Sequence, residues 1–354
     1  MTEAPRLLIY GAYGYTGELL TRGVAARGIP AILAGRDAAR LDALARQHGL
    51  EARVVGLDDP RALDAALDGV TVVAHAAGPF VRTARPMVEA CLRTRTHYLD
   101  ITGELDVFEA LFARDAEARS AGVMLLPGAG FDVVPSDCLA AHLARRLPSA
   151  THLALAFKGL SKTSRGTALT TIEHLGLGGR VRRDGVIVTV PLGSLVRRID
   201  FGRGPQLAAA IPWGDVSTAF HSTGIPNIEV YLPAPRPLLM GMRAIGAAPS
   251  LVGSRPARRL LSWLVKAGPA GPSDEDRARG GATLWGEATD ATGKRVTARL
   301  TTTDGYTLTR DAVLAIAERV LAGDAPPGFQ TPSRAYGADF VLTLPGAARE
   351  DLDG

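Results

Sequence analysis

The chain has 354 residues, which is enough for two domains, and 46% of them are hydrophobic, as in an ordinary globular protein. The formal net charge of +4 at pH 7 is modest, and the sequence holds no nucleic-acid-binding motif, so a nucleic-acid partner is not expected. The two cysteines, Cys91 and Cys138, offer neither a disulfide framework nor the spacing of a zinc site, so no metal is expected.

The same features predict a cytoplasmic protein. Two cysteines fit a reducing compartment, and the first strand begins within a few residues of the N-terminus, so no signal peptide is visible. No segment offers ~20 uninterrupted apolar residues, so a membrane-spanning helix is not expected. The composition leaves open whether the chain forms a homo-oligomer.

The first element in chain order is a short apolar segment, Leu7–Tyr10, which has the character of a strand. Three glycines follow in the pattern G-x-x-G-x-x-G, and a helical pattern comes directly after them. This order is typical of a dinucleotide-binding site, where the glycines permit a tight turn, the approach of a pyrophosphate and close helix packing. The alternative is a plain strand–turn–helix connection. The predicted cofactor-binding residues of this run are Gly11, Tyr13, Gly14, Tyr15, Thr16 and Gly17.

A second strand, Ala31–Ala34, is followed by Arg36, which lies 19 residues after Gly17. In a site for NAD an acidic residue near this point binds the ribose 2′-hydroxyl. A guanidinium group suits a 2′-phosphate instead, so Arg36, with help from Arg40, predicts NADP(H) as the cofactor. The alternative is a solvated arginine that precedes a helix capped by Asp37.

Strand and helix patterns alternate over about the first 130 residues, which is typical of a parallel sheet covered by helices on both faces. The number of strands matches a complete Rossmann-type, doubly wound α/β sheet. Asp58 is the predicted cap of the third helix, and the alternative is that it contacts the adenine amino group of the dinucleotide. The predicted strands are Leu7–Tyr10, Ala31–Ala34, Ala52–Gly56, Thr71–Ala76, Tyr98–Ile101 and Val123–Leu126, and the predicted helices are Gly17–Arg27, Ala38–His48, Pro60–Leu67, Ala84–Thr94, Leu105–Ala121 and Ser136–Leu147.

The fourth predicted strand leads into a loop of small and apolar residues. Loops at the carboxyl ends of parallel strands line the ligand crevice of such a sheet, and small residues let the chain pass close to a dinucleotide. Ordinary turn chemistry is the alternative. The residues of this loop that are predicted to contact the cofactor are Ala77, Gly78, Pro79 and Phe80.

Two polar clusters, His97–Glu104 and Gly128–Asp137, lie at the ends of the fifth and sixth strands. A carboxylate at the end of a buried strand is costly unless it is paired or used, and Asp132 lies between a glycine turn and an apolar pair. Both clusters are therefore predicted to face the nicotinamide end of the crevice. Thr102 and Gly103 in the first cluster are added to the predicted cofactor-binding residues.

After about Ala150 the patterns indicate a second α/β domain with a mixed or antiparallel sheet. A polar turn between two alternating segments predicts a hairpin, and the amphipathic helix that follows it is predicted to return to the first domain. Residues from about Ala347 are expected to fray. The predicted elements are strands Thr151–Phe157 and Gly185–Val190, helix Thr167–Leu175, hairpin strands Ala282–Ala288 and Arg295–Thr301, helix Thr309–Leu321 and a loop over Gly323–Pro332. The predicted domains are an NADP-binding domain (1–150), a substrate domain (151–308) and a returning helix and tail (309–346).

The segment 233–267 contains five arginines and one lysine but no acidic residue, together with many large apolar side chains. Such a basic amphipathic segment is a candidate for peripheral contact with a membrane or lipid, or for guiding an apolar substrate. The alternative is a helical pair that covers the second domain.

Taken together, these motifs resemble the saccharopine dehydrogenase-like oxidoreductases, a family that includes the trans-acting enoyl reductases of lipid and polyketide assembly. The resemblance implies an NADP-binding Rossmann domain and a second α/β domain that shapes the substrate pocket. Two residues depart from the family pattern: Tyr13 replaces a threonine, and Ala129 replaces a common cysteine. The motifs that carry the resemblance are Gly11–Gly17, Ala34–Arg36, Gly78–Phe80, Thr96–Glu104 and Gly130–Asp137, with a weaker match at Gly328–Gly337.

The reaction needs a proton donor beside the cofactor. None of the seven tyrosines has a lysine four residues later, which excludes the Tyr-x-x-x-Lys catalytic motif of short-chain dehydrogenases. The remaining candidates near the predicted crevice are His97, Tyr98, Glu104 and Asp132, and we select Tyr98 with Asp132 as the catalytic pair.

The leading hypothesis is an NADPH-dependent reductase of an activated double bond, with a small-molecule or carrier-bound acyl substrate of lipid-like or thioester-linked character. One alternative is a saccharopine-type C–N oxidoreductase that acts on amino-acid adducts. Another is a non-catalytic NADP sensor or scaffold.

Overall fold

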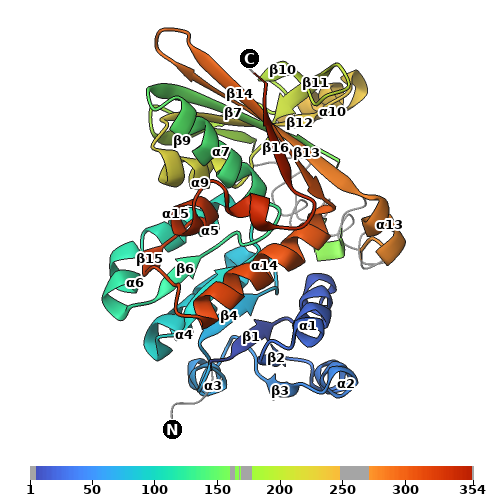
Figure 1. Cartoon of the computed structure of the whole chain (residues 1–354), viewed down its shortest axis with the longest axis vertical. Coiled ribbons are helices and arrows are strands. Elements are labelled where there is room, and N and C mark those ends of the chain that lie inside the picture. The colour runs from blue at the N-terminus through green and yellow to red at the C-terminus, as the bar shows by residue number, and fades with distance from the viewer. Residues whose placement is uncertain (1–4, 160–163, 167, 169–177, 248–270, 353–354) are drawn as a thin grey trace. The chain divides into compact units, whose positions relative to one another are not determined.

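The computed structural model describes residues 5–159, 164–166, 168, 178–247 and 271–352 (Figure 1). Contacts divide the chain into two compact units. The first unit contains Met1–Val134 and Tyr306–Ala335, and the second contains Pro135–Gly305 and Tyr336–Gly354.

The first unit is built on a seven-stranded sheet in the order β15-β6-β5-β4-β1-β2-β3, and all of its strand pairs are parallel. The order reverses between β1 and β4, which is the switch point at which doubly wound sheets bind their ligands. The predicted Rossmann-type sheet is confirmed. Its strands are β1 (Leu7–Tyr10), β2 (Ala31–Gly35), β3 (Glu51–Val54), β4 (Val72–His75), β5 (His97–Asp100), β6 (Met124–Leu126) and β15 (Gly328–Phe329).

The helices of the first unit follow the strands in alternation, with one exception to the predicted pattern. The single helix predicted over Leu105–Ala121 is two helices, because the chain turns at Ala113 and Arg114. The turn lets the Asp115 carboxylate accept the backbone N–H of Phe329, at 2.7 Å, which a straight helix would not place there. The helices are α1 (Tyr15–Arg27), α2 (Ala38–His48), α3 (Pro60–Ala66), α4 (Phe80–Thr94), α5 (Leu105–Phe112), α6 (Asp115–Ala121) and α14 (Gly305–Leu321).

Carboxylates cap the N-termini of two consecutive helices in this unit. Asp37 accepts the N–H of Arg40 at the start of α2. Asp59 accepts the N–H groups of Arg61 and Ala62 at the start of α3, so the prediction of Asp58 as this cap was wrong by one residue. Each cap satisfies N–H groups that the helix itself leaves without partners.

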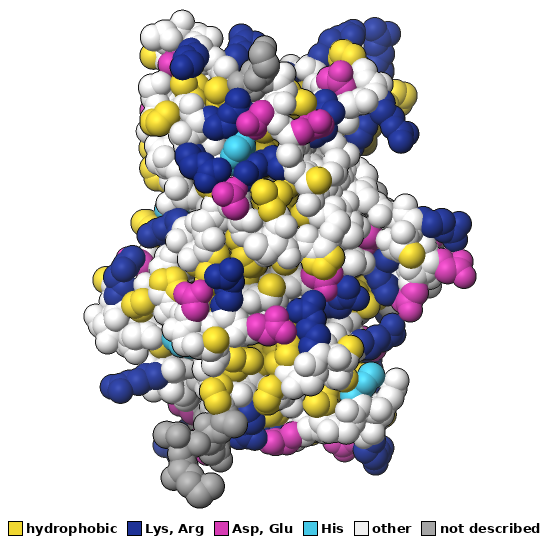
Figure 2. All heavy atoms as spheres, in the orientation of Figure 1, with side chains coloured by type: hydrophobic (Ala, Val, Ile, Leu, Met, Phe, Trp, Pro, Cys, Tyr) yellow, Lys and Arg dark blue, Asp and Glu magenta, His cyan; other side chains and the backbone are white. Residues whose placement is uncertain are grey.

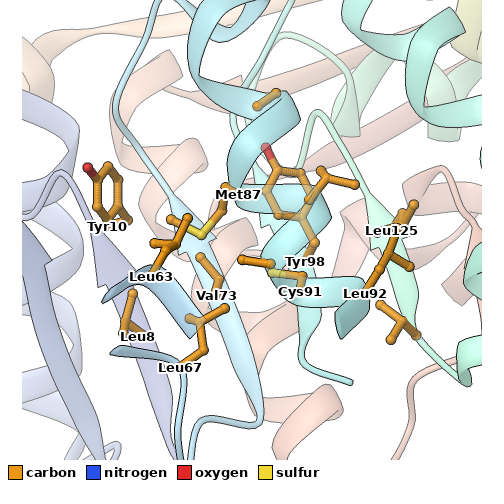
Figure 3. Packing of buried hydrophobic residues seen from close by; sticks show 14 of the residues in the cluster. Leu8, Tyr10, Leu63, Leu67, Val73, Met87, Cys91, Leu92, Tyr98 and Leu125 are labelled. Atoms are coloured by element: carbon orange, nitrogen blue, oxygen red, sulfur yellow. The ribbon is translucent and has the colours of Figure 1, made fainter. Parts of the chain in front are cut away.

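One face of the first sheet packs against α3, α4, α5 and α6 (Figure 3). Alternate strand residues point to this face, among them Leu8, Val73, Tyr98 and Leu125, and Met87 of α4 meets them. The opposite face buries the intervening residues, and α1 packs against β1 there. Burial on both faces explains why the strands read as continuous apolar runs.

Helix α14 comes from the distant C-terminal part of the chain and packs along α1. A Cβ atom on Gly23 would lie 2.4 Å from Leu314 Cδ1, so the glycine permits the close approach. The guanidinium group of Arg27 pairs with Asp311 at 3.0 Å. Helix α14, which lies about 300 residues further along the chain than β1, therefore completes the first unit.

The second unit contains a mixed sheet of nine strands, seven of them in the order β10-β11-β12-β7-β13-β14-β16. Only the pairing of β12 with β7 is parallel along this path. The predicted mixed sheet and its hairpin, β13 with β14, are confirmed. The strands are β7 (Ala150–Lys158), β8 (Gly179–Arg183), β9 (Val186–Val190), β10 (Val196–Asp200), β11 (Pro205–Ala210), β12 (Asn227–Pro233), β13 (Gly281–Asp290), β14 (Arg295–Thr303) and β16 (Ala348–Asp351).

The C-terminal tail of the second unit is ordered as far as Leu352, the last described residue, contrary to the expected fraying. Strand β16 pairs with β14, and Asp351 at its end accepts a hydrogen bond from His142 at 2.8 Å and pairs with Arg146 at 2.9 Å. The predicted helix Thr167–Leu175 lies almost wholly outside the described residues. The remaining helices are α7 (Val134–Arg146), α9 (Asp215–Thr223), α10 (Arg236–Ala247), α13 (Asp274–Arg279), α15 (Pro332–Tyr336) and a short 3-10 helix, η1 (Phe340–Thr343).

Basic and acidic side chains are interspersed on the face of the molecule that Figure 2 shows. Ion pairs of the first unit include Arg93 with Asp64 at 2.7 Å and Arg119 with Asp115 at 2.8 Å. Exposed pairs of this kind add little stability each, so the fold depends on its buried apolar residues.

The segment 233–267 is described only as far as Ala247, where α10 ends. The Leu238 and Met240 side chains of this helix are 50% and 69% exposed. No helix among the described residues is long and apolar enough to cross a membrane. Peripheral contact of this segment with lipid stays a prediction.

Strand β15 should be a major source of stability although it has only two residues. Phe329 is 0% exposed, so Phe329→Ala should lower the free energy of unfolding by about 3–5 kcal/mol, through lost burial and the cavity it leaves. Val54→Ala, at a strand residue that is 53% exposed, is the control and should cost less than about 1 kcal/mol in urea denaturation. Equal losses for both variants would contradict the role of this strand.

Candidate functional site

The glycine turn after β1 leaves the N-terminus of α1 open to a ligand. Gly11 has φ +80°, and a Cβ atom on Gly17 would lie 2.2 Å from the Gly11 carbonyl oxygen, so both positions require glycine. Gly14 is the N-cap residue of α1, and no side chain caps the helix. The first N–H groups of this 13-residue helix therefore point toward the space where a pyrophosphate binds in doubly wound folds.

Two arginines stand at the end of β2, as predicted for a 2′-phosphate. Arg36 and Arg40 are both exposed, and Arg40 packs over the ring of Tyr13, with 4.7 Å from its Cζ atom to the ring centroid. The Asp37 carboxylate caps α2, so the alternative interpretation of this turn is correct for Asp37. That cap does not occupy the two guanidinium groups, which remain suited to a phosphate.

The loop Ala77–Phe80 is held from two sides. Thr83 donates its hydroxyl to the Ala77 carbonyl at 2.7 Å. The Glu104 carboxylate accepts the N–H groups of Phe80 and Val81, at 2.9 and 2.8 Å. Glu104 thus caps α4 from a neighbouring loop, so this carboxylate is used for structure.

Asp100 joins the loops that follow β5 and β6. Its Oδ1 atom accepts the N–H groups of Thr102, at 3.0 Å, and Gly128, at 2.9 Å, and its Oδ2 atom accepts the Tyr98 hydroxyl at 2.8 Å. The Ala129 N–H donates to the backbone carbonyl of Asp100 at 2.7 Å. Burial raises the pKa of Asp100 to about 6, although its hydrogen bonds oppose the shift. The two predicted polar clusters therefore meet.

Asp132 lies at the point where these two loops approach each other. A Cβ atom on Gly103 would lie 2.8 Å from Asp132 Oδ2, so the carboxyl group packs directly on the predicted cofactor-binding residue Gly103. The residue is partly exposed, and burial of its carboxyl group raises its pKa to about 7. A carboxyl group that is half protonated near neutral pH can donate a proton there.

Tyr98, the other predicted catalytic residue, lies in the core of the first unit (Figure 3). Its hydroxyl donates to Asp100, and burial raises its pKa well above the ordinary value. The ring is fully enclosed, so the hydroxyl serves to hold Asp100. Proton donation by Tyr98 stays a prediction that this geometry does not support.

His97 and Glu104, the other candidate donors, are also committed elsewhere. His97 is the first residue of β5, so it lies at the amino ends of the parallel strands, opposite the glycine turn. Its Nδ1 atom accepts the N–H of Met124 at 3.0 Å. Glu104 caps α4, as described above. Among the candidates from the sequence, Asp132 alone combines partial exposure with a pKa near neutrality.

Two residues of α14 that the sequence did not indicate border this site. The Thr309 hydroxyl accepts the N–H of Phe131 at 3.0 Å, next to Asp132. The Tyr306 ring packs edge-on against Tyr15, at 5.0 Å between centroids, beside the N-terminus of α1. Both residues lie in the first turns of a helix far along the chain, so no local pattern signals their position.

Comparison with known proteins agrees with this geometry. Residues 7–126 match the family model of the saccharopine dehydrogenase NADP-binding domain. The chain carries a domain of this family. The predicted resemblance to saccharopine dehydrogenase-like oxidoreductases and the predicted NADP cofactor are confirmed at the level of this domain.

The chain is also similar to curated relatives over part of its length. It is 34% identical over 154 residues to a trans-acting enoyl reductase of Mycobacterium leprae, which is 40% of this chain and 36% of that relative. The corresponding protein of Mycobacterium ulcerans is 33% identical over 162 residues, which is 41% of this chain and 38% of the relative. The match spans little more than a third of either relative.

Solved structures resemble the chain over its whole length. Saccharopine dehydrogenase (L-Glu forming) of Saccharomyces cerevisiae has a TM-score of 0.67 at 16% identity, covering 98% of this chain and 100% of that one. Homospermidine synthase of Legionella pneumophila, solved with NAD, has a TM-score of 0.62 at 11% identity, covering 100% and 93%. At these identities the likeness shows the fold alone.

The raised pKa of Asp100 predicts how stability depends on pH. The folded protein binds this proton more tightly than the unfolded chain, so stability should fall as pH rises from about 4 through about 6. In Asp100→Asn the side-chain oxygen can still accept the N–H groups of Thr102 and Gly128, and the amide nitrogen can donate to the Tyr98 hydroxyl, so the residue can keep its partners without the charge. The free energy of unfolding of this variant, relative to that of the wild type, should therefore increase by about 3 kcal/mol across that pH range, as measured by urea denaturation.

Asp42→Asn, at an exposed position of α2, is the matched control and should leave the pH dependence as in the wild type. Parallel stability profiles for Asp100→Asn and the wild type would contradict the effect of burial on Asp100.

Proposed function

We propose that the protein is an NADPH-dependent reductase that acts on an activated double bond in a lipid-like or thioester-linked substrate. The observation that carries the proposal is the position of Asp132, a carboxyl group with a pKa of about 7, against Gly103 at the carboxyl edge of a dinucleotide-binding sheet. The similarity of about 40% of the chain to trans-acting enoyl reductases supports this class of substrate.

The first unit supplies the groups that would hold NADPH. The N–H groups at the start of α1 suit the pyrophosphate, and Arg36 with Arg40 suits the 2′-phosphate. The loops after β4, β5 and β6 border the nicotinamide half of the crevice, since the sheet reverses its order between β1 and β4. When bound, the cofactor supplies the hydride.

Asp132 completes the reduction in this proposal. Hydride addition to one carbon of the double bond leaves negative charge on the neighbouring carbon or its conjugated oxygen, and the Asp132 carboxyl group donates the balancing proton. The resulting carboxylate regains a proton from solvent, because Asp132 is partly exposed. Gly103, which leaves room for the carboxyl group, and Thr309, which holds the adjoining loop, position Asp132.

Stopped-flow measurement of NADPH oxidation tests the proposal. Crotonyl-type thioesters should be reduced, whereas cyclic or open imines of amino acids should not. Turnover of imines alone would favour the saccharopine-type C–N oxidoreductase, and tight NADPH binding without turnover of any acceptor would favour the sensor or scaffold. Either result would overturn the proposal.

Arg36→Ala should weaken NADPH binding by roughly 10-fold or more while leaving NADH binding nearly unchanged, because only NADPH carries the 2′-phosphate. Isothermal titration calorimetry with both nucleotides measures the two affinities. Arg46→Ala, at an exposed position in the last turn of α2, is the matched control. Equal losses for the two nucleotides would rule out 2′-phosphate recognition by Arg36.

Asp132→Asn should lower kcat/KM by about 100- to 10,000-fold, which is the usual contribution of a general acid. In the wild type, kcat/KM for reduction should fall as pH rises through about 7, since the proton donor is lost, and the variant should lack this inflection. Asp106→Asn, at an exposed carboxyl group of α5, is the control. A pH profile that is the same in wild type and Asp132→Asn would show that another group supplies the proton.

A further inference from the structure

The side chain of Tyr13 leaves the glycine turn and reaches the end of β2. Its hydroxyl oxygen accepts two backbone N–H groups, those of Arg36 and Asp37, both at 3.1 Å. These are the N–H groups that follow β2, where a 2′-phosphate approaches in folds of this type. One tyrosine oxygen therefore occupies both of the backbone donors at this corner.

The rest of Tyr13 holds Arg40. The Arg40 guanidinium group packs over the Tyr13 ring at 4.7 Å, and its Nη2 atom donates to the Tyr13 backbone carbonyl at 2.7 Å. Gly35 makes room for the ring, because a Cβ atom there would lie 2.6 Å from ring atom Cε1. Cation–π packing and a charged hydrogen bond together fix the orientation of a side chain that would otherwise be mobile.

These contacts decide which groups can recognise a phosphate. While the Tyr13 hydroxyl holds the N–H groups of Arg36 and Asp37, a 2′-phosphate cannot accept them, and recognition falls to the Arg36 and Arg40 side chains. The Asp37 Oδ1 atom accepts the N–H of Arg40 as the cap of α2. Tyr13 thus orders the turn that carries one arginine and directly holds the other.

We propose that Tyr13 is the positioning residue that sets the preference of this protein for NADPH over NADH, by ordering the Arg36 turn with its hydroxyl and Arg40 with its ring and carbonyl. The inference rests on the proposed function only in that NADPH is the cofactor. The family pattern has a threonine at the position of Tyr13. A threonine side chain has no ring for Arg40 to pack on and is too short to reach the end of β2.

The test isolates the 2′-phosphate. Calorimetry with adenosine 2′,5′-bisphosphate and adenosine 5′-monophosphate gives the factor by which the 2′-phosphate improves binding, without any need for turnover. Tyr13→Phe removes the hydroxyl and keeps the ring, and should reduce this factor by about 3- to 10-fold, as expected for the loss of neutral hydrogen bonds. Affinity for the monophosphate should change less than 2-fold.

Tyr10→Phe is the matched control. This variant loses a hydroxyl that donates to the backbone carbonyl of Val55 at 3.3 Å, and Tyr10 holds neither arginine. The factor should stay at the wild-type value. Arg40→Ala, an exposed change that does not threaten folding, should reduce the factor on its own. In that background Tyr13→Leu should reduce the factor no further than Tyr13→Phe does, because the ring acts only through the Arg40 guanidinium group.

The outcomes separate the two proposals. If the wild type binds neither NADPH nor the bisphosphate, the proposed function fails. If the wild type binds both and Tyr13→Phe binds the bisphosphate as tightly as the wild type, or more tightly, the inference fails while the proposed function stands. Tighter binding would mean that the hydroxyl competes with the phosphate for the N–H groups of Arg36 and Asp37.

Discussion

A single buried carboxylate at the end of β5 organises the loops at the carboxyl ends of the strands in the first unit. Asp100 accepts hydrogen bonds from its own loop, from the loop after β6 and from Tyr98 below it. Glu104 extends the same arrangement to the loop after β4, whose N–H groups it accepts. Three loops that are far apart in sequence are therefore fixed to one another by carboxylates, and the shape of the crevice depends on these charges being satisfied.

Asp100 and Asp132 show how neighbouring carboxyl groups take different roles. Burial is the main cause of the raised pKa of both carboxyl groups, and at Asp100 several hydrogen bonds that favour the charged form oppose the shift. The first is held as a structural acceptor, and the second is left near neutrality at the surface of the site. Environment, rather than residue type, separates the structural acid from the candidate proton donor.

Features determined by local sequence could be predicted, and features determined by packing could not. The glycine turn, the helix of Ala38–His48 and the hairpin of β13 and β14 follow from short-range patterns, and each is present. Strand β15 has two residues and exists only because β6 offers it an edge, so its segment reads as a loop. Tyr98 was predicted to be a site residue from the alternation of side chains along its strand. That alternation does not separate core residues from site residues when helices cover both faces of the sheet.

The same limit applies to the site. The sequence indicated Asp132 and the glycine turn, because both stand in unusual local contexts. Tyr306 and Thr309 could not be found, since their contacts join positions that are far apart along the chain. The role of Tyr13 also depends on its reach to another strand, which spacing alone does not reveal.

The carboxylate caps have an electrostatic consequence for how an anion approaches. Asp37, Asp59 and Glu104 sit on the N-termini of α2, α3 and α4, and each cancels the partial positive charge that a helix start presents to solvent. The start of α1 has no such side chain. The first N–H groups of α1 therefore stay available to a diphosphate, whereas side-chain carboxylates already accept N–H groups at the starts of α2, α3 and α4.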